Sequence, residues 1–197
     1  HDDVTPLLVA YPALEVLTIR GSQGLSLTPA RYPALRSLTI ESGGLPAAVV
    51  RAVGDCDLPA LTHLELWLGT DNYGGDATVD DLRQILTGTR LPRLTTLGLR
   101  DAEIADHVAA AVAGAPVVAR LEVLDLSLGM LSDTGAGALL AGQPLTHLRR
   151  LDLHHHFLSQ PVMDRLTGEL GAAGVELDLS DAGKPGDDDD RYIAVSE

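Results

Sequence analysis

Aromatic residues, cysteine and long apolar runs are scarce in this chain. Phe, Trp and Tyr make up 3% of the 197 residues, so the core has to be built from Leu, Val, Ile and Ala. Cys56 is the single cysteine, which excludes an intramolecular disulfide and fits a reducing compartment. No apolar run approaches the roughly 20 residues that cross a bilayer, and the first residues do not read as a signal peptide. These absences predict a cytoplasmic protein that does not bind membranes.

Basic residues are few as well. The chain has 14 Lys and Arg against 28 Asp and Glu, which gives a formal net charge of −14, and Lys184 is the one lysine. The electrostatic field of this negative charge repels the phosphates of nucleic acids and anionic lipids, so no nucleic-acid partner is predicted. A basic protein would be attracted. The shortage of lysine beside abundant Ala, Gly and Asp is typical of a GC-rich genome.

One pattern of leucines recurs along the whole chain. The segment LEVLDL at 121–126 is followed 27 residues later by LRRLDL at 148–153, and both read LxxLxL. Similar units, the last of them degenerate, are spaced by 21, 26, 33, 27, 27 and 26 residues, and they end at Ile19, Ile40, Leu66, Leu99, Leu126, Leu153 and Leu179. A repeat of this length predicts a stack of similar structural units.

Each unit contains one short strand and one return segment, neither of which can bury its apolar side alone. Stacking the units pairs the strands into a parallel sheet and closes a continuous leucine core, so Leu124 and Leu151 should be structural. Helical returns are predicted at 45–53, 79–86, 104–112, 135–141 and 162–170, the last with Ser159 as its capping residue. The 21-residue unit is too short for a full helix, so an extended return is predicted.

These units resemble leucine-rich repeats of the ribonuclease-inhibitor type, most closely from Leu121 to Gly135. The resemblance implies an α/β solenoid, a curved right-handed stack with a parallel sheet on the concave side and helices on the convex side. DLHHH at 152–156 and RYIAVSE at 191–197 also resemble a group of bacterial leucine-rich-repeat proteins without an established activity. The position that holds asparagine in the family pattern is occupied here by other residues, namely Gly43, Gly69, Ala102, Gly129 and His156.

The chain divides into two parts on this interpretation. Residues 1–182 should form about seven solenoid units, and residues 183–197 an acidic loop and a C-terminal capping strand. Residues 5–14 resemble the end of a return helix, so the strand of that unit is expected upstream of His1. The segment 192–195 is predicted to pair with the sheet edge beside 177–179, because exposed edges invite aggregation.

Side chains between the repeat leucines point away from the core and form the concave face. Solenoids use this kind of surface for partners, although the same side chains could serve solubility alone. The candidate partner-binding residues on this face and its rim are Glu65, Trp67, Tyr73, Arg100, Asp125, Asp152 and His154. Two of them, Asp125 and Asp152, stand with Asp178 in adjacent strands, and such a row of like charges costs stability unless it is offset.

Trp67 is the one tryptophan and should face outward, because it follows the inward Leu66. It precedes a glycine-rich loop at 69–76 that contains Tyr73. Two interpretations stay open: an exposed interface anchor, or a ring that packs under its own loop and holds it down.

Metal and nucleophile chemistry have weaker support. The run of three histidines at 154–156 alternates faces in a strand, so the rings should not converge on one ion, and His156 should be hydrogen-bonded in the turn. Asp187 to Asp190 lacks the spacing of a calcium loop. Cys56 lies between two carboxylates, which disfavour a thiolate. No metal and no cofactor are predicted.

The sequence therefore favours a non-enzymatic module that binds a protein partner through the concave face. One alternative is a metal-dependent hydrolase that uses Asp125, Asp152 and His154, although no complete catalytic motif is present. The other is a structural scaffold domain of a larger protein, which predicts exposed apolar residues near Leu7 and Leu8.

Overall fold

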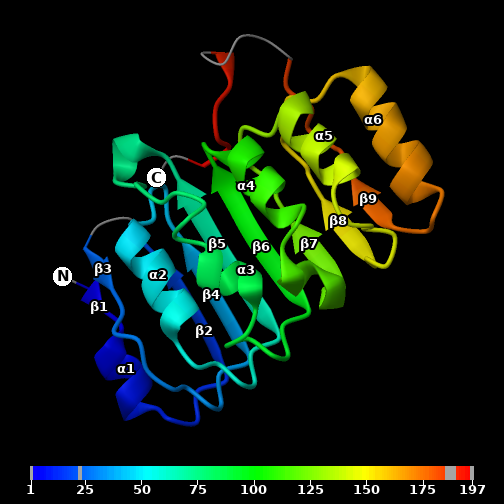
Figure 1. Ribbon diagram of the computed structural model, residues 1–197. Coiled ribbons are helices and arrows are strands. Elements are labelled where there is room, and N and C mark those ends of the chain that lie inside the picture. The colour runs from blue at the N-terminus through cyan, green and yellow to red at the C-terminus, as the bar shows by residue number, and fades with distance from the viewer. Residues whose placement is uncertain (1, 22–23, 185–189, 196–197) are drawn as a thin grey trace.

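A seven-stranded parallel sheet runs through the whole protein. The computed structural model describes residues 2–21, 24–184 and 190–195. The strands follow one another in sequence order, so each strand pairs with the next one along the chain (Figure 1). They are β2 (Val16–Arg20), β4 (Ser37–Glu41), β5 (His63–Gly69), β6 (Thr96–Ala102), β7 (Val123–Asp125), β8 (Arg150–Asp152) and β9 (Glu176–Asp178).

The repeat leucines set the register of this sheet. The second leucine of each unit pairs with its counterpart in the next strand, from Leu38 through Leu64, Leu97, Leu124 and Leu151 to Leu177. Leu64, Leu97 and Leu124 are completely buried. A slip of one residue would turn all of these side chains outward, so the repeat specifies the pairing.

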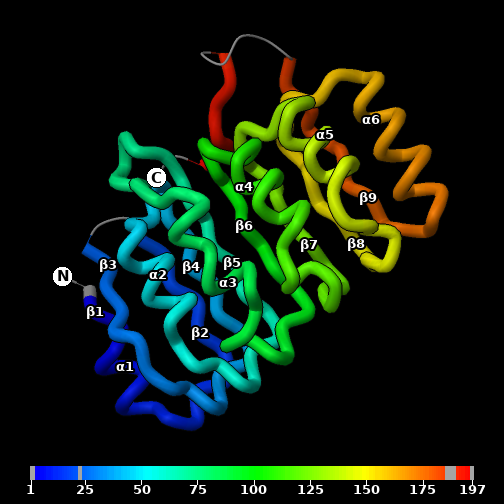
Figure 2. Tube along the Cα trace, viewed as in Figure 1, coloured from blue at the N-terminus to red at the C-terminus, as the bar shows by residue number. Residues whose placement is uncertain are grey.

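The return segments cover one side of the sheet (Figures 1 and 2). The sequence placed them correctly, although their lengths differ. The helices are α1 (Thr5–Ala10), α2 (Ala47–Asp55), α3 (Arg83–Thr87), α4 (Ala105–Val112), α5 (Asp133–Ala141) and α6 (Gln160–Leu166), with 3-10 turns η1 (Asp71–Tyr73) and η2 (Pro116–Arg120). A π-helical turn, η3 (Thr167–Gly171), continues α6. The first full unit returns without a helix in its described part, through β3 (Leu25–Ser26), which pairs with β1 (Asp2–Asp3).

Two details of the predicted helices were wrong. α3 begins at Arg83 rather than at 79, because the Asp81 carboxylate accepts hydrogen bonds from both the backbone N–H and the hydroxyl of Thr78 and so fixes a turn there. Ser159 precedes α6 but its hydroxyl makes no capping bond. Its backbone N–H instead donates to Asp133 of the preceding unit, at 2.7 Å.

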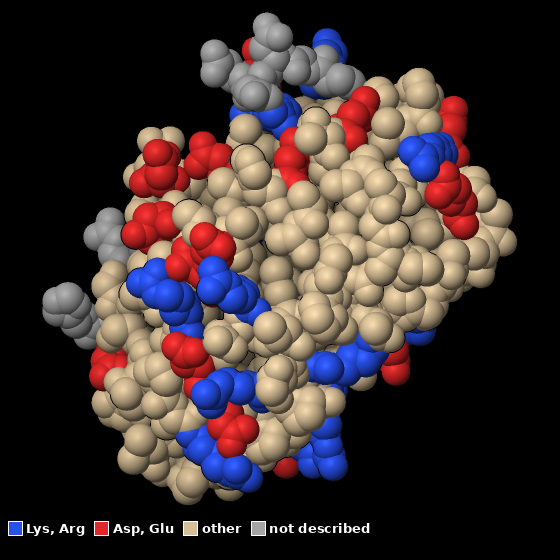
Figure 3. Space-filling view, in the orientation of Figure 1, with Lys and Arg blue, Asp and Glu red and all other residues tan. Residues whose placement is uncertain are grey.

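The core between sheet and helices is almost entirely aliphatic, as the composition predicted. The helix-covered side shows wide uncharged areas in the space-filling view (Figure 3). None of the described helices has the length and apolarity needed to cross a membrane.

A row of left-handed residues lies at or just beyond the ends of the last four strands, and we call it the turn row. Its members have φ of 53°, 67°, 56° and 56° and are, in order, Asp101, Leu128, His155 and Asp181. Each of the first three donates its N–H to a carbonyl of the next unit, on Ser127, His154 and Ser180 respectively, at 2.9–3.0 Å. The turn row therefore extends the ladder beyond the strands.

The hydrogen bonding that the sequence predicted for His156 in the turn is confirmed. Its ring is completely buried. Nδ1 accepts from the N–H of Leu158 at 3.1 Å, so Nε2 carries the proton and donates to the carbonyl of Leu179 at 3.0 Å. Burial lowers the pKa of His156, which keeps the ring in this neutral form. An imidazole thus supplies one acceptor and one donor, as an asparagine amide would.

The expected capping strand at β9 is not formed by the described residues. Residues 190–195, which we call the C-terminal strap, contain no strand and cross the ends of β8, β7 and β6 (Figure 1). The N–H of Ala194 donates to Leu128 O at 2.8 Å, and Ile193 is buried. Most of the acidic run at 187–190 lies outside the described residues.

Candidate functional site

The outward face of the sheet, opposite the helices, carries most of the predicted site residues. Alternation along the strands places Glu65 and Trp67 of β5 on this face, and Arg100 of β6 pairs in register with Trp67. β5 and β6 lie near the middle of the sheet order. The outward face is therefore centred on these three side chains.

Glu65, Trp67 and Arg100 form one hydrogen-bonded cluster. The Glu65 carboxylate accepts from Trp67 Nε1 at 2.6 Å and from Arg100 Nη1 at 3.0 Å. The guanidinium carbon of Arg100 lies 5.2 Å from the centre of the Trp67 ring, a cation–π contact. Neither of the two interpretations of Trp67 foresaw these contacts. The indole is half-buried, and its orientation is fixed by the neighbouring strand.

The charge of Glu65 is stabilised in this cluster. Burial alone would raise its pKa, but His63, Trp67 and Arg100 together lower the pKa to about 2. Gly98 leaves room for this arrangement, because a Cβ at this position would lie 3.1 Å from Cγ of Glu65 and the Glu65 side chain would have to shift. The missing side chain lets Glu65 extend over β6 toward Arg100.

Asp125 of β7 is the next carboxylate along the face. Arg100 Nε lies 3.3 Å from Asp125 Oδ2 and donates to the hydroxyl of Ser127 at 3.0 Å. The backbone N–H of Ser127 in turn donates to Asp125 at 2.9 Å. Burial raises the pKa of Asp125 and the charge of Asp152 adds to this, although Arg100 and Ser127 oppose it. Arg100 thus bridges carboxylates on two different strands.

The guanidinium of Arg150 likewise bridges carboxylates on two strands, β8 and β9. Arg150 contacts Asp152 at 2.7 Å, Glu176 at 2.7 Å and Asp178 at 3.3 Å. Asp152 also lies 2.6 Å from His154 Nδ1. Burial opposes ionisation of Asp152, but the hydrogen bonds from Arg150 and His154 lower its pKa overall. The like charges that the sequence placed in adjacent strands are therefore offset by arginines.

The hydrolase alternative finds only part of its residues together. Asp152, His154 and Asp178 have ligand atoms within 4.8 Å of one another, whereas Asp125 does not belong to this group. Arg150 Nη2 already lies on both Asp152 and Asp178. A guanidinium therefore already offsets the charge of these two carboxylates.

Tyr73 lies in a loop that is locked against the preceding unit. The loop packs so closely on Gly44 that a Cβ there would lie 2.5 Å from the Tyr73 carbonyl. Tyr73 remains 44% exposed. Among the described rings, Tyr73 and Trp67 do not contact each other; the rings that do are His155, Phe157 and Tyr192, which meet edge to face. Tyr73 at the rim and Trp67 at the centre of the outward face are therefore separate features.

The sequence did not identify several residues that shape the face. Gly98 and Ser127 stand at outward positions of the repeat, but their roles beside Glu65 and Arg100 depend on how far side chains reach across strands. Arg150 could have been found, because it stands at an outward position two residues before Asp152. The buried Asp101 gave no signal, since an aspartate that follows an LxxLxL segment looks like an ordinary turn residue.

The fold and the face define an α/β protein with a seven-stranded parallel sheet covered by helices on one side. No protein-family model matches the chain, and no curated protein matches it. A crystal structure of a protein from Bacteroides fragilis is similar, with a TM-score of 0.85 and 34% identity over 92% of this chain. The chain covers 51% of that protein, about half its length. This likeness supports the α/β fold and supplies no activity to transfer.

Proposed function

We propose that the chain is a leucine-rich-repeat solenoid that binds a protein partner through its outward sheet face without catalysing a reaction. The repeat assignment is supported by the strand order, which follows the sequence, and by the leucines that pair in register from strand to strand. In such a stack the open sheet face is the surface that is broad, rigid and free of helices.

The observation that carries the proposal is the central cluster of Glu65, Trp67 and Arg100. Tryptophan and arginine are the residues that most often dominate binding energy at protein interfaces, and they do so near the centre of the contact. Here both side chains are already held in place by hydrogen bonds and a cation–π contact. A partner would lose little side-chain entropy when it binds them.

The charges of the face favour a basic partner. Six outward carboxylates stand against three guanidinium groups: Glu41, Glu65, Asp125, Asp152, Glu176 and Asp178 against Arg20, Arg100 and Arg150. The internal ion pairs therefore leave a negative excess. This excess speeds the approach of a basic protein and makes that association sensitive to salt.

A capture experiment tests the proposal. Immobilised wild type, Trp67→Ala and Tyr11→Ala are exposed to lysate of the source cells at about 0.1 M and about 1 M salt. Tyr11 is an exposed aromatic residue outside the sheet, so its variant is the matched control. We expect one protein that wild type and Tyr11→Ala retain at low salt and Trp67→Ala loses.

The recovered protein is then titrated into the wild type while tryptophan emission is followed, with the emission of the partner alone subtracted, because Trp67 is the one tryptophan of this chain. Removing an interface anchor weakens binding by about 30-fold or more. Equal capture by all three proteins, capture by none of them, or binding that leaves the emission unchanged would contradict the proposal. Thermal melts of the variants show whether each one is folded.

The scaffold alternative has one observation in its favour. Leu7 is 41% exposed, as that interpretation predicts, and Val9, Tyr11 and Val16 are exposed close by in sequence, whereas Leu8 is buried. A Val9→Lys, Val16→Lys double variant tests it. If the wild type does not self-associate, the scaffold alternative predicts that the double variant keeps the wild-type melting temperature and elution volume, because the patch then has only an accessory role in the isolated chain.

A further inference from the structure

The C-terminal strap lies along the turn row and contacts three of its members in reverse order. Tyr192 O lies 3.0 Å from His155 Nε2, the N–H of Ala194 donates to Leu128 O at 2.8 Å, and the N–H of Val195 donates to Asp101 Oδ1 at 3.0 Å. Residues separated by up to 94 positions are joined in this way. The strap therefore ties together the ends of three neighbouring units.

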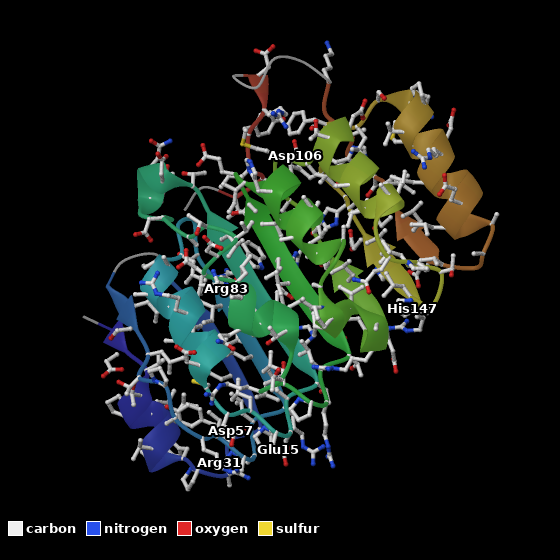
Figure 4. All side chains as sticks on the ribbon, in the orientation of Figure 1. Glu15, Arg31, Asp57, Arg83, Asp106 and His147 are labelled. Atoms are coloured by element: carbon white, nitrogen blue, oxygen red, sulfur yellow. The ribbon has the colours of Figure 1, made fainter. Side chains whose placement is uncertain are left out.

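Two side chains anchor the beginning of the strap. Arg191 donates to the carbonyl of Met130 at 2.9 Å and contacts the Asp106 carboxylate at 3.3 Å. Figure 4 shows Asp106 at the start of α4, close to where the strap passes. The ring of Tyr192 contacts those of His155 and Phe157 edge to face, with centroids 5.3 and 5.6 Å away.

Asp101 is an unusual residue at the far end of the strap. Its carboxyl group is completely buried, and its backbone is in the left-handed region. Oδ1 accepts from the strap, whereas Oδ2 has no hydrogen-bond partner among the described residues. A buried carboxylate with one oxygen unpaired is costly when it is ionised, far less so when it is neutral.

We propose that the strap is a proton-linked latch, which docks on the turn row while the Asp101 carboxyl is neutral and loosens when that carboxyl ionises. This inference does not depend on the proposed partner binding. The proton leaves to solvent, and no other group has to react. Loosening uncovers the side of Phe157 that Tyr192 now contacts and the carbonyl of Leu128.

The sign of the effect follows from proton linkage. Burial raises the pKa of Asp101 to about 7 in the docked state, although the strap N–H groups and Arg100 oppose this. An exposed aspartate has a pKa of about 3.9. The docked state therefore holds the proton more tightly, so docking is strongest at low pH, weakens as the pH rises, and is weakest above about 7.

The other charged groups around the strap do not change this sign. Arg100 is the charge whose field reaches Asp101, and it favours the ionised form. Asp106 and Arg191 form an ion pair at the start of the strap. His155 is the remaining titratable ring along the turn row, so it needs a control of its own.

Amide hydrogen exchange of the full chain, read residue by residue by NMR and corrected for intrinsic rates, tests the latch. In wild type the protection of Ala194 and Val195 is expected to fall on the order of a hundredfold between pH 5 and pH 8. The amide of Leu126, which donates to Asp152 O within the sheet, serves as the internal reference for global opening.

Two variants locate the responsible group. Asp101→Asn keeps an acceptor for the Val195 N–H, tolerates the left-handed backbone and cannot ionise, so its strap protection is expected to vary less than about threefold over the same pH range. His155→Gln keeps a donor for Tyr192 O and should retain the wild-type pH dependence. A flat wild-type profile, or a fall that persists in Asp101→Asn, overturns the latch.

Direct titration of the Asp101 carboxyl carbon in the wild type provides a second measurement that does not depend on the variants folding. A midpoint near pH 7 agrees with the latch. A midpoint near 4, the value of an exposed carboxyl, overturns it.

Discussion

The close crossing of Gly44 and Gly69 offers the sharpest test of how the loop at 69–76 is held. Gly69 has φ of 69°, and an added Cβ would lie 1.9 Å from the carbonyl oxygen of Gly43. That same oxygen accepts from the N–H of Thr70 at 2.9 Å. The obstacle is backbone on both sides, so Gly69→Ala can be accommodated only if the two units separate.

Gly74 provides a control in the same loop. Its φ is 90°, again in the left-handed half of the map, but an added Cβ would meet nothing within 4 Å. Gly74→Ala therefore carries only the conformational cost, roughly 1–2 kcal/mol. Gly69→Ala carries a similar cost plus the steric one, typically a further 1–3 kcal/mol, so we expect a loss of about 2–5 kcal/mol.

Urea unfolding followed by circular dichroism measures both losses as shifts of the midpoint at constant slope. If the two units cross as closely as the structure shows, Gly69→Ala should lower the free energy of unfolding by at least about 1 kcal/mol more than Gly74→Ala does. Equal losses in the two variants, or a wild-type midpoint for Gly69→Ala, would show that the loop is not locked to Gly43 and Gly44 as the structure indicates.

Three further predictions concern the core and the face. Leu124→Asp should abolish cooperative unfolding, because it places a carboxylate at a completely buried position, whereas Leu124→Ala should cost about 3–5 kcal/mol. The fold lowers the pKa of Glu65 from 4.5 to about 2. The ionised side chain therefore stabilises the protein fully above about pH 4.5, and this stabilisation is lost as the pH falls toward 2. Glu65→Gln should therefore flatten the acid limb of a pH–stability curve and remove at most about 3 kcal/mol at pH 7. Burial raises the pKa of the Cys56 thiol, so an aromatic disulfide reagent should label it only after unfolding.

The backbone architecture could be predicted because the repeat itself encodes it. Each LxxLxL segment places two leucines on the core side of a strand, and the nearly constant spacing aligns one unit with the next. Pairs such as Leu97 with Leu124 follow directly from that pattern. The helical returns followed from their length and apolar spacing, and α3 departed only where Asp81 forms a local turn with Thr78.

The contacts on the outward face could not be predicted in the same way. The candidate residues were identified one by one, but the cluster of Glu65, Trp67 and Arg100 uses the space that Gly98 leaves beside Glu65. A glycine in a strand normally signals weakness or a bulge, so the sequence does not reveal that it makes space for a neighbouring carboxylate.

The C-terminal strap was misplaced for a different reason. The segment at 192–195 has the composition of a short strand, and the open edge of β9 was the nearest place for one. The β9 edge has its own protection, because the acidic side chains of Glu176 and Asp178 disfavour edge-to-edge pairing. The strap instead finds N–H acceptors on the turn row, which the strand pattern did not reveal.

Arg100 and Arg150 explain how the acidic outward face can stay folded and still keep a negative excess. Asp125 and Asp152 are register partners on adjacent strands, and such like charges destabilise a sheet. Arg100 offsets the first by bridging it to Glu65, and Arg150 offsets the second by bridging it to Asp178 and Glu176. Each guanidinium serves more than one carboxylate, so the strands are tied together while a negative excess remains. That excess, displayed on side chains whose positions are already fixed, is what a basic partner would meet.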